Sequence, residues 1–247
     1  MNDEKFVHLH LKSKCFYRMS TILHIETSTS VCSVAVSSDG ACVFERTDRS
    51  GPNHAVQLGV FVDEALSFVD NRLLPLDAVA VSGGPGSYTG LRIGVSMAKG
   101  ICYGRSLPLI AIPTLELMAV PLLLGEQIAE GERLCPMLDA RRMEVYAAIY
   151  DRSLTPVREI GADVVDTDTY LDYLEQGPVC FFGNGAEKCK TVITHPNARF
   201  IDGIEPLARW MFPLAERRLH EGRTEDVAYY VPFYLKDFVA KTPKKLL

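Results

Sequence analysis

Hydrophobic positions in the first half of the chain switch between the spacing of strands and the spacing of a helix. The runs at 21–27, 31–37 and 41–46 are rich in β-branched residues and are separated by short polar turns, which predicts a three-stranded meander. Residues 54–70 carry apolar side chains at 58, 61, 62, 65 and 69, the spacing of a helix that buries one face. The segments that follow predict strand, helix, strand and helix, at 77–82, 91–103, 109–112 and 114–124.

A weaker version of the same order follows a polar, glycine-flanked connection at 125–132. We predict strands at 133–138, 144–150, 157–165 and 179–183, with helices at 169–175, 186–191 and 206–220. Two lobes that each begin with a meander and then alternate helix and strand predict an α/β fold with mixed sheets. This is the two-lobed plan of the actin-like ATPases (ASKHA, ribonuclease H-like), with an N-terminal lobe over 19–124 and a smaller C-terminal lobe over 125–247.

The first 18 residues show no such pattern. They contain four basic residues but no continuous apolar segment and no small-residue cleavage site, so a secretory signal is not indicated. We expect residues 1–18 to be a disordered leader or an artefact of the assigned start, with Met19 as the alternative first residue.

Composition narrows the class of protein. The formal net charge is −5, and the only basic block is the short tail Lys241 to Lys245, which argues against an extended nucleic-acid footprint. Seven scattered cysteines indicate reduced thiols in a cytoplasmic protein. The longest apolar runs are far shorter than a membrane span, so no membrane association is expected.

The helix at 54–70 has more apolar surface than one sheet face requires. Its polar residues fill a narrow arc, which leaves Val56, Val60 and Phe68 outside the inner stripe. A second partner must cover that surface. Either another protein or the chain's own second lobe meets the requirement.

The segment from Ser82 to Gly94, SGGPGSYTGLRIG, is the strongest candidate for a site. A glycine loop that leads into a helix directs backbone N–H groups towards an anion. The alternative is a tight joint between strand and helix, in which Gly90 and Gly94 permit close packing. The segment lacks the spacing of a Walker A loop, and Thr89 occupies the third glycine position of G-x-G-x-x-G, so general physics favours the joint.

Other candidate chemistries are poorly supported. No two of the six histidines are three or four residues apart, so the sequence offers no His-x-x-x-His metal site, and we expect neither metal nor cofactor. Ser87 does not lie in a G-x-S-x-G elbow. Asp139 and Glu144 with Arg141 and Arg142 form either a charged pocket or, as favoured here, a solvated turn.

Five segments resemble signature segments of the TsaB (YeaZ) family and occur in the same order as in that family. They are ILHIETSTSVCSVAV, SGPNHAVQLGVFVDEAL, GGPGSYTGLRIG, LDARRMEVYAAIY and YYVPFYLK, and the resemblance covers most of residues 20–236. It implies a catalytically silent subunit that pairs with the related catalytic subunit TsaD, which transfers threonylcarbamoyl to the adenosine next to the anticodon of tRNA.

The resemblance also implies the location of the partner surface, on the glycine-rich segment and the first helix. His54, at the helix start beside Pro52 and Asn53, is then an interface contact rather than only a cap. The expected surface comprises His54, Gln57, Leu58, Val60, Phe61, Pro85, Gly86, Ser87, Tyr88, Thr89 and Arg92. Further partners implied are the ATPase TsaE, tRNA through the complex alone, and a second copy of the chain in a homodimer.

A vestigial nucleotide site is expected at Glu26, Thr27, Ser28 and Thr29, where an actin-like ATPase has an acidic residue and its first phosphate loop. The acid here is glutamate rather than the usual aspartate, and no glycine allows phosphate to approach closely. Three hypotheses therefore stand: a scaffold that activates TsaD, an actin-like ATPase or small-molecule kinase that uses Glu26, and direct RNA binding by the Lys241 to Lys245 tail.

Overall fold

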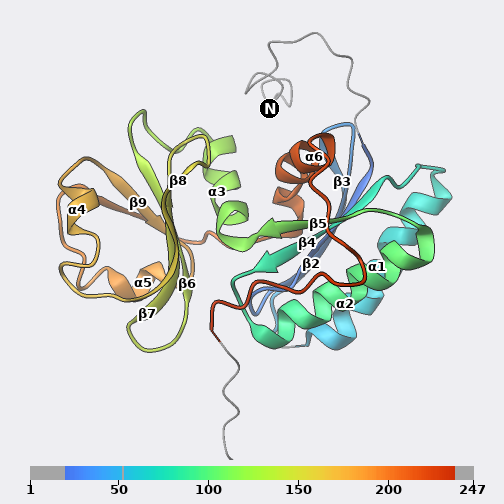
Figure 1. Ribbon diagram of the computed structural model, residues 1–247, viewed down its shortest axis with the longest axis horizontal. Coiled ribbons are helices and arrows are strands. Elements are labelled where there is room, and N and C mark those ends of the chain that lie inside the picture. The colour runs from blue at the N-terminus through green and yellow to red at the C-terminus, as the bar shows by residue number, and fades with distance from the viewer. Residues whose placement is uncertain (1–19, 52, 237–247) are drawn as a thin grey trace, which may run out of the picture.

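The apolar runs that predict strands form two five-stranded sheets in the computed structural model, which describes residues 20–51 and 53–236 (Figure 1). The first sheet contains β1 (Ile22–Glu26), β2 (Cys32–Ser38), β3 (Ala41–Asp48), β4 (Ala78–Gly84) and β5 (Leu109–Pro113). The second contains β6 (Arg133–Asp139), β7 (Glu144–Tyr150), β8 (Pro156–Val164), β9 (Val179–Phe182) and β10 (Ala198–Ile201).

Both sheets have the same topology. Their orders are β3-β2-β1-β4-β5 and β10-β9-β6-β7-β8. In each, the first strand of an antiparallel meander lies at the centre and pairs in parallel with the fourth strand of its lobe. The predicted two-lobed actin-like α/β fold with mixed sheets is confirmed.

Helices cover both faces of the first sheet. One face carries α1 (His54–Asn71) and α2 (Tyr88–Arg105), and the other carries α3 (Thr114–Leu124) and α6 (Phe212–His220). Helix α1 buries Leu58, Val62, Ala65 and Val69, whose spacing places them on one stripe against the sheet.

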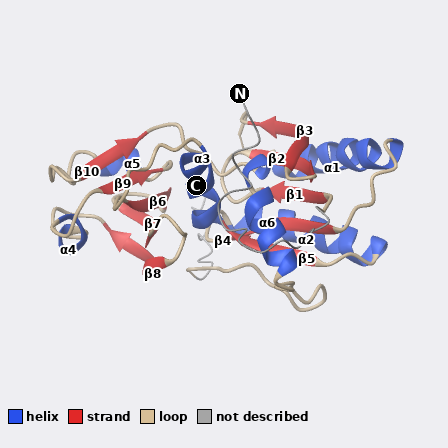
Figure 2. Cartoon of the chain, turned by 90° about the horizontal axis from the view of Figure 1, so that it is seen from above, coloured by secondary structure: helices blue, strands red, loops and turns tan. Residues whose placement is uncertain are grey.

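Helix α3 lies between the two sheets (Figure 2). Leu117 and Val120 pack into the core of the first lobe, whereas Met118 and Leu122 pack into the core of the second. A helix that is buried on all sides needs apolar residues all round, which this segment supplies. It is the element that joins the two lobes through a common core.

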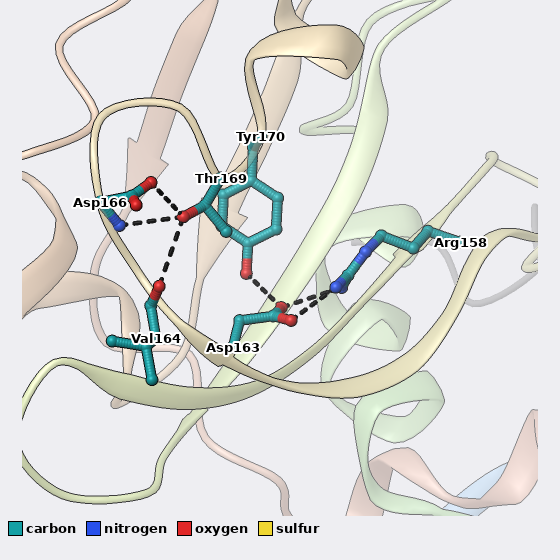
Figure 3. A network of polar contacts seen from close by, with 6 residues as sticks. All are labelled: Arg158, Asp163, Val164, Asp166, Thr169 and Tyr170. Carbon is teal, nitrogen blue, oxygen red and sulfur yellow. Dashed lines mark hydrogen bonds and ion pairs between the residues drawn. The ribbon is translucent and has the colours of Figure 1, made fainter.

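Among the described residues, the helices on the outer face of the second lobe are single turns, α4 (Leu171–Leu174) and α5 (Ala186–Cys189). A buried polar network connects β8 to the start of α4 (Figure 3). Arg158 binds both carboxylate oxygens of Asp163, at 2.5 and 2.9 Å, and the Tyr170 hydroxyl donates to the same carboxylate at 2.7 Å. Tyr170 is almost fully buried, and its ring packs 5.5 Å from that of Phe181.

Beyond residue 124, one predicted helix is wrong and one strand was missed. The helix expected at 206–220 is interrupted: a 3-10 turn, η2 (Ala208–Trp210), precedes α6, and Pro213 occupies the first turn of α6. Proline lacks the N–H that a continuous helix needs at that point, so the helix begins there. Strand β10 was not predicted, because its four residues carry little alternation and owe their conformation to parallel pairing with β9.

The predicted boundary near residue 124 separates the two sheets, but the chain crosses back after the second lobe. Met211 and Leu214 pack into the core of the first lobe. The following residues, 224–236, form a strap along the first lobe, and Glu225 bridges to Leu109 of β5. Predictions for residues 1–18 and for the tail at 241–245 lie outside the described residues.

Candidate functional site

The predicted nucleotide loop at the end of β1 is folded in on itself. Glu26 is fully buried, and its Oε1 accepts a hydrogen bond from the Ser28 backbone N–H at 2.5 Å. The Thr27 N–H donates to Ser82 Oγ at 3.4 Å, and the Val31 N–H donates to Thr29 Oγ1 at 3.2 Å. These backbone donors, which a phosphate loop would offer to its ligand, are bound by the chain itself.

The glycines of the next loop seat α2 directly on this loop. A Cβ atom added to Gly90 would collide with the Thr27 carbonyl oxygen, and one added to Gly94 would collide with Thr27 Oγ1. Thr27 Oγ1 in turn donates to the Gly90 carbonyl at 2.8 Å. Close packing therefore accounts for both glycines, as the interpretation of the segment as a tight joint predicts.

The start of α2 is also fixed to the nucleotide loop by its backbone. The Ser87 N–H donates to the Ser28 carbonyl at 2.7 Å, and a Cβ atom on Gly86 would lie 2.8 Å from that of Ser28. Ser87 caps the helix, because its hydroxyl accepts from the Gly90 N–H at 3.2 Å. This cap makes α2 begin at Tyr88, three residues before the predicted start.

Burial changes the acidity of Glu26. Removal from water raises the pKa of its carboxyl to about 7, against the opposing effect of its hydrogen bond with Ser28. Its second oxygen and the Ser28 hydroxyl are buried without a hydrogen-bond partner among the described residues. The carboxyl is therefore a poorly solvated acid inside the joint rather than an exposed ligand for a metal or nucleotide.

His54 ties the start of α1 to the same loop. Its Nε2 donates to the Thr29 carbonyl at 2.6 Å, and its side chain is almost completely buried. The N-cap residue Asn53 makes no side-chain capping bond, so this contact fixes the first turn. His54 thus acts within the chain here, and its contact with a partner stays a prediction.

The outer face of α1 is not covered by the second lobe. Val56 and Val60 remain 62% and 49% exposed. Helix α1 covers one face of the first sheet, whereas α3 covers the opposite face and separates that sheet from the second lobe (Figure 1). Phe68 is different, because its ring packs 5.3 Å from that of Phe44 on β3. The alternative in which the chain's own second lobe covers this face is therefore wrong.

A shallow, mainly apolar groove lies on α2 and reaches α1 at Ala55. Among the described residues that line it, Arg92 is the only charged one, and its guanidinium group stacks over the ring of Tyr88 at 5.5 Å. Ser96 and Gly100 also line the groove, and no described residue comes within 4 Å of a Cβ atom added at Gly100. The remaining lining residues are Ala55, Ile93, Met97 and Ile101.

The predicted interface residues fall into two groups. His54, Leu58 and Pro85 are buried, so they support the surface from below. The exposed or half-buried members are Gln57, Val60, Phe61, Gly86, Ser87, Tyr88, Thr89 and Arg92. Sequence reasoning missed Ile93, Met97 and Gly100, although small residues at 96, 100 and 104 on one helical face were a usable signal.

The strap passes over the same joint. The Phe233 N–H donates to the Gly83 carbonyl at 2.7 Å, and Lys99 of α2 donates to the carbonyls of Ala228 and Tyr230 at 2.9 and 3.1 Å. Tyr234 packs its ring 4.8 Å from that of Tyr88. The strap ends the described chain beside the predicted partner surface.

The turn with Arg141 and Arg142 is solvated, as favoured from sequence. Both arginines are exposed and have positive φ values of 75° and 49°. Asp139 pairs with Lys188 and accepts from the Arg141 N–H at 3.1 Å, while Glu144 pairs with Lys236 of the strap. The charges are thus divided among separate contacts rather than gathered in a pocket.

Residues 20–51 and 53–236 contain no group of three or more His, Cys, Asp or Glu placed to hold a metal ion. No helix in these ranges combines the length and apolar character needed to cross a membrane.

Comparisons with known proteins point to tRNA modification. The family model described as TsaD, tRNA N6-adenosine threonylcarbamoyltransferase, matches residues 48–244. The chain is 32% identical to the tRNA threonylcarbamoyladenosine biosynthesis protein TsaB of Escherichia coli K12, over 91% of this chain and 99% of that protein. It is 30% identical to TsaB of Bacillus subtilis 168, over 70% of this chain and 75% of that protein.

Solved structures agree on the fold. YeaZ from Pseudomonas aeruginosa superposes with a TM-score of 0.70 at 24% identity, covering 88% of this chain and all of that chain. A second structure, of an uncharacterized protein with similarity to the peptidase YEAZ from Pseudomonas aeruginosa, gives 0.71 at 23% identity with the same coverage.

Proposed function

The chain belongs to the TsaB family of tRNA threonylcarbamoyladenosine biosynthesis proteins, and on that basis we propose that it is a non-catalytic scaffold subunit that binds and activates a TsaD-like catalytic subunit. Family membership gives it a role in forming threonylcarbamoyladenosine in tRNA. What we propose beyond that role is that the chain contributes by binding its partner rather than by a chemical step. The observation that best supports this is the exposed apolar face of α1 and α2.

The exposed face has the chemistry of a protein interface. Val56 and Val60 are exposed on α1, and an apolar groove on α2 reaches α1 at Ala55, with Arg92 as its single charged lining residue among the described ones. Contiguous apolar surface of this kind marks interaction sites, with charge confined to the rim. The small residues Ser96 and Gly100 allow a partner helix to approach α2 closely. We therefore assign the partner contact to a helix packed along the groove.

A scaffold role is also supported by the state of the nucleotide loop. The backbone donors at Thr27, Ser28 and Val31 are already bound, and α2 occupies the space above them. An ATPase or kinase that uses Glu26 would have to lift α2 from this loop. The scaffold instead acts by favouring the active conformation of its partner, which is a shift in population rather than a chemical step.

Surface substitutions test the partner contact. We expect Val60→Glu and Val56→Glu to lower the affinity for the TsaD-like subunit at least about tenfold, because each places a charge in a buried apolar contact. Val164→Glu is the matched control, since Val164 is 69% exposed on β8 of the second lobe. Co-purification with the native partner and t6A content of tRNA in a depleted strain are the readouts.

Survival of both the complex and the modification in the α1 variants would refute the assignment of this surface. Calorimetry with ATP and magnesium on the isolated chain tests the other half of the proposal. Tight binding with turnover would contradict the scaffold role and favour the ATPase or kinase.

The remaining partners follow the same proposal. A TsaE-like ATPase resets the complex, tRNA is bound through the complex alone, and without TsaD the apolar face closes a homodimer. Light scattering of the isolated chain checks the homodimer, which Val60→Glu is expected to weaken. Steeply salt-dependent tRNA binding by the lone chain would instead favour direct RNA contact.

A further inference from the structure

A second cavity lies where the two lobes meet, away from the partner surface. It has a volume of about 320 Å³ and is bounded by α3, by the turn between β7 and β8, and by the end of α6. Helices α3 and α6 share the core of the first lobe, whereas the turn belongs to the second (Figure 1). We call it the arginine cavity, after the three arginines that line it.

Positive charge exceeds negative charge in the arginine cavity. Arg217, Arg218 and Arg223 line it together with Glu116 and Glu221. Arg217 is exposed and forms no ion pair with any residue of the described ranges. The pair between Arg223 and Glu221 is about half exposed on both sides, so it is weak and exchangeable. A chain with net charge −5 thus concentrates cationic groups at one point.

Arg218 is held as a fixed, buried member of the group. Its Nη2 donates to Glu116 Oε2 at 3.0 Å, its Nη1 donates to the Ala111 carbonyl, and its Nε is buried without a partner among the described residues. Burial lowers its pKa, the Glu116 carboxylate opposes this, and the nearby Arg223 and Arg217 lower it further. Its positive charge is therefore incompletely compensated.

The helix dipole explains only part of this arrangement. Cations are favoured in the last turn of a helix, which suits Arg217 and Arg218 of α6. Arg223 lies beyond the end of the helix, yet it reaches the same cavity. Because the dipole of α6 does not explain the position of Arg223, the grouping of the three arginines indicates a binding site.

The wall from the second lobe is rigid and carries hydroxyls. In the turn, Asp151 Oδ1 accepts from the Ser153 and Thr155 N–H groups at 2.8 and 2.9 Å. Their hydroxyls form no hydrogen bond within the described residues. Leu154, between them, packs against the cores of both lobes. Two hydroxyl-bearing residues thus line the cavity together with the three arginines.

We propose that the arginine cavity binds a small phosphate-bearing molecule, with Arg217 and Arg223 contacting its phosphate and with Ser153 and Thr155 donating from the opposite wall. Guanidinium groups match the geometry of phosphate oxygens, and the volume suits a small ligand. The ligand bridges the two lobes. The site is independent of the α1 and α2 surface, so either assignment can fail alone.

Binding of inorganic phosphate to the full chain tests the proposal, measured by phosphorus NMR line broadening at constant ionic strength set with chloride. We expect saturable binding that weakens about tenfold or more in Arg217→Gln and in Arg223→Gln, as for loss of a charge-assisted hydrogen bond. Arg72→Gln is the matched control, because Arg72 is exposed at the far end of α1.

Absence of saturable binding by the native chain would overturn the proposal, as would equal binding by Arg217→Gln and the native chain. A short single-stranded RNA distinguishes the source of the phosphate. If RNA does not displace the bound phosphate, the result supports a small-molecule ligand. Displacement of bound phosphate by RNA at low concentration would overturn it in favour of a nucleic-acid backbone.

Discussion

The loop after the first strand differs between two lobes whose sheets have the same strand order. In the first lobe, α2 packs on Thr27 and Ser28, and Glu26, Thr27 and Ser28 have almost no exposed surface. In the second, the equivalent turn at 139–144 is open, with Arg141 and Arg142 in solvent.

The helix that follows the fourth strand explains the difference. In both lobes glycines there press against the end of the first strand: Gly86 and Gly90 against residues 27 and 28, and Gly185 against Leu138, where an added Cβ would lie 2.9 Å away. The helix that follows has 18 residues in α2 but only four in α5. Identical sheet topology thus leaves the loop under a long helix in one lobe and open in the other. The helices, not the sheet, make this difference.

The largest effect on stability is expected from adding a side chain where α2 packs against the loop after β1. Gly90→Ala should destabilise the chain by about 3 kcal/mol or more, because the new methyl group meets the Thr27 backbone. Gly100→Ala is the matched control on the same helix, where open space surrounds the position and alanine should stabilise by about 0.5–1 kcal/mol. Urea unfolding measures both. Equal stability of the two variants would contradict the seating of α2.

Burial of the loop makes stability depend on pH through Glu26. Because the folded pKa is raised from 4.5 to about 7, its favourable contribution is complete below pH 4.5 and is lost as the pH rises towards 7. Glu26→Gln removes that loss, so at pH 8 it should be more stable than the native chain by about 2–3 kcal/mol. Urea unfolding at pH 5 and pH 8 gives the comparison. A difference that does not grow with pH would show that the carboxyl is not desolvated.

The second lobe should respond to its polar network instead. Tyr170→Phe removes the hydroxyl that donates to Asp163, and the expected loss is about 1–2 kcal/mol, since Arg158 still binds the carboxylate. Partner binding should be unchanged, because the network lies in the other lobe (Figure 3). Thermal unfolding and co-purification are the two readouts. Loss of the complex without loss of stability would contradict the expectation that partner binding depends on the first lobe alone.

The smallest effect is expected where the strap reaches the open turn. Lys236 pairs with Glu144 at a half-exposed position, so Lys236→Ala should change stability by less than about 1 kcal/mol. High salt should abolish even that difference. A larger loss would mean that the strap holds the two lobes together more strongly than an exposed ion pair allows.

Much of the fold was available from local pattern. The meander at 21–46 and the helix at 54–70 were predicted within two residues at each end, because β-branched runs and one apolar helical stripe agree with the final burial. The second lobe was harder. Its outer helices are single turns and β10 has four residues, so pairing and packing rather than propensity decide them.

The candidate site shows the same division. The sequence by itself placed the glycine-rich segment, the excess apolar surface of α1 and the altered phosphate loop, because glycine content, apolar spacing and residue type are local properties. Only the tertiary structure decided that Gly90 and Gly94 press on Thr27, that His54 binds Thr29, and that Val56 and Val60 stay uncovered. Those facts depend on contacts between residues that lie far apart along the chain, and no local pattern encodes such contacts.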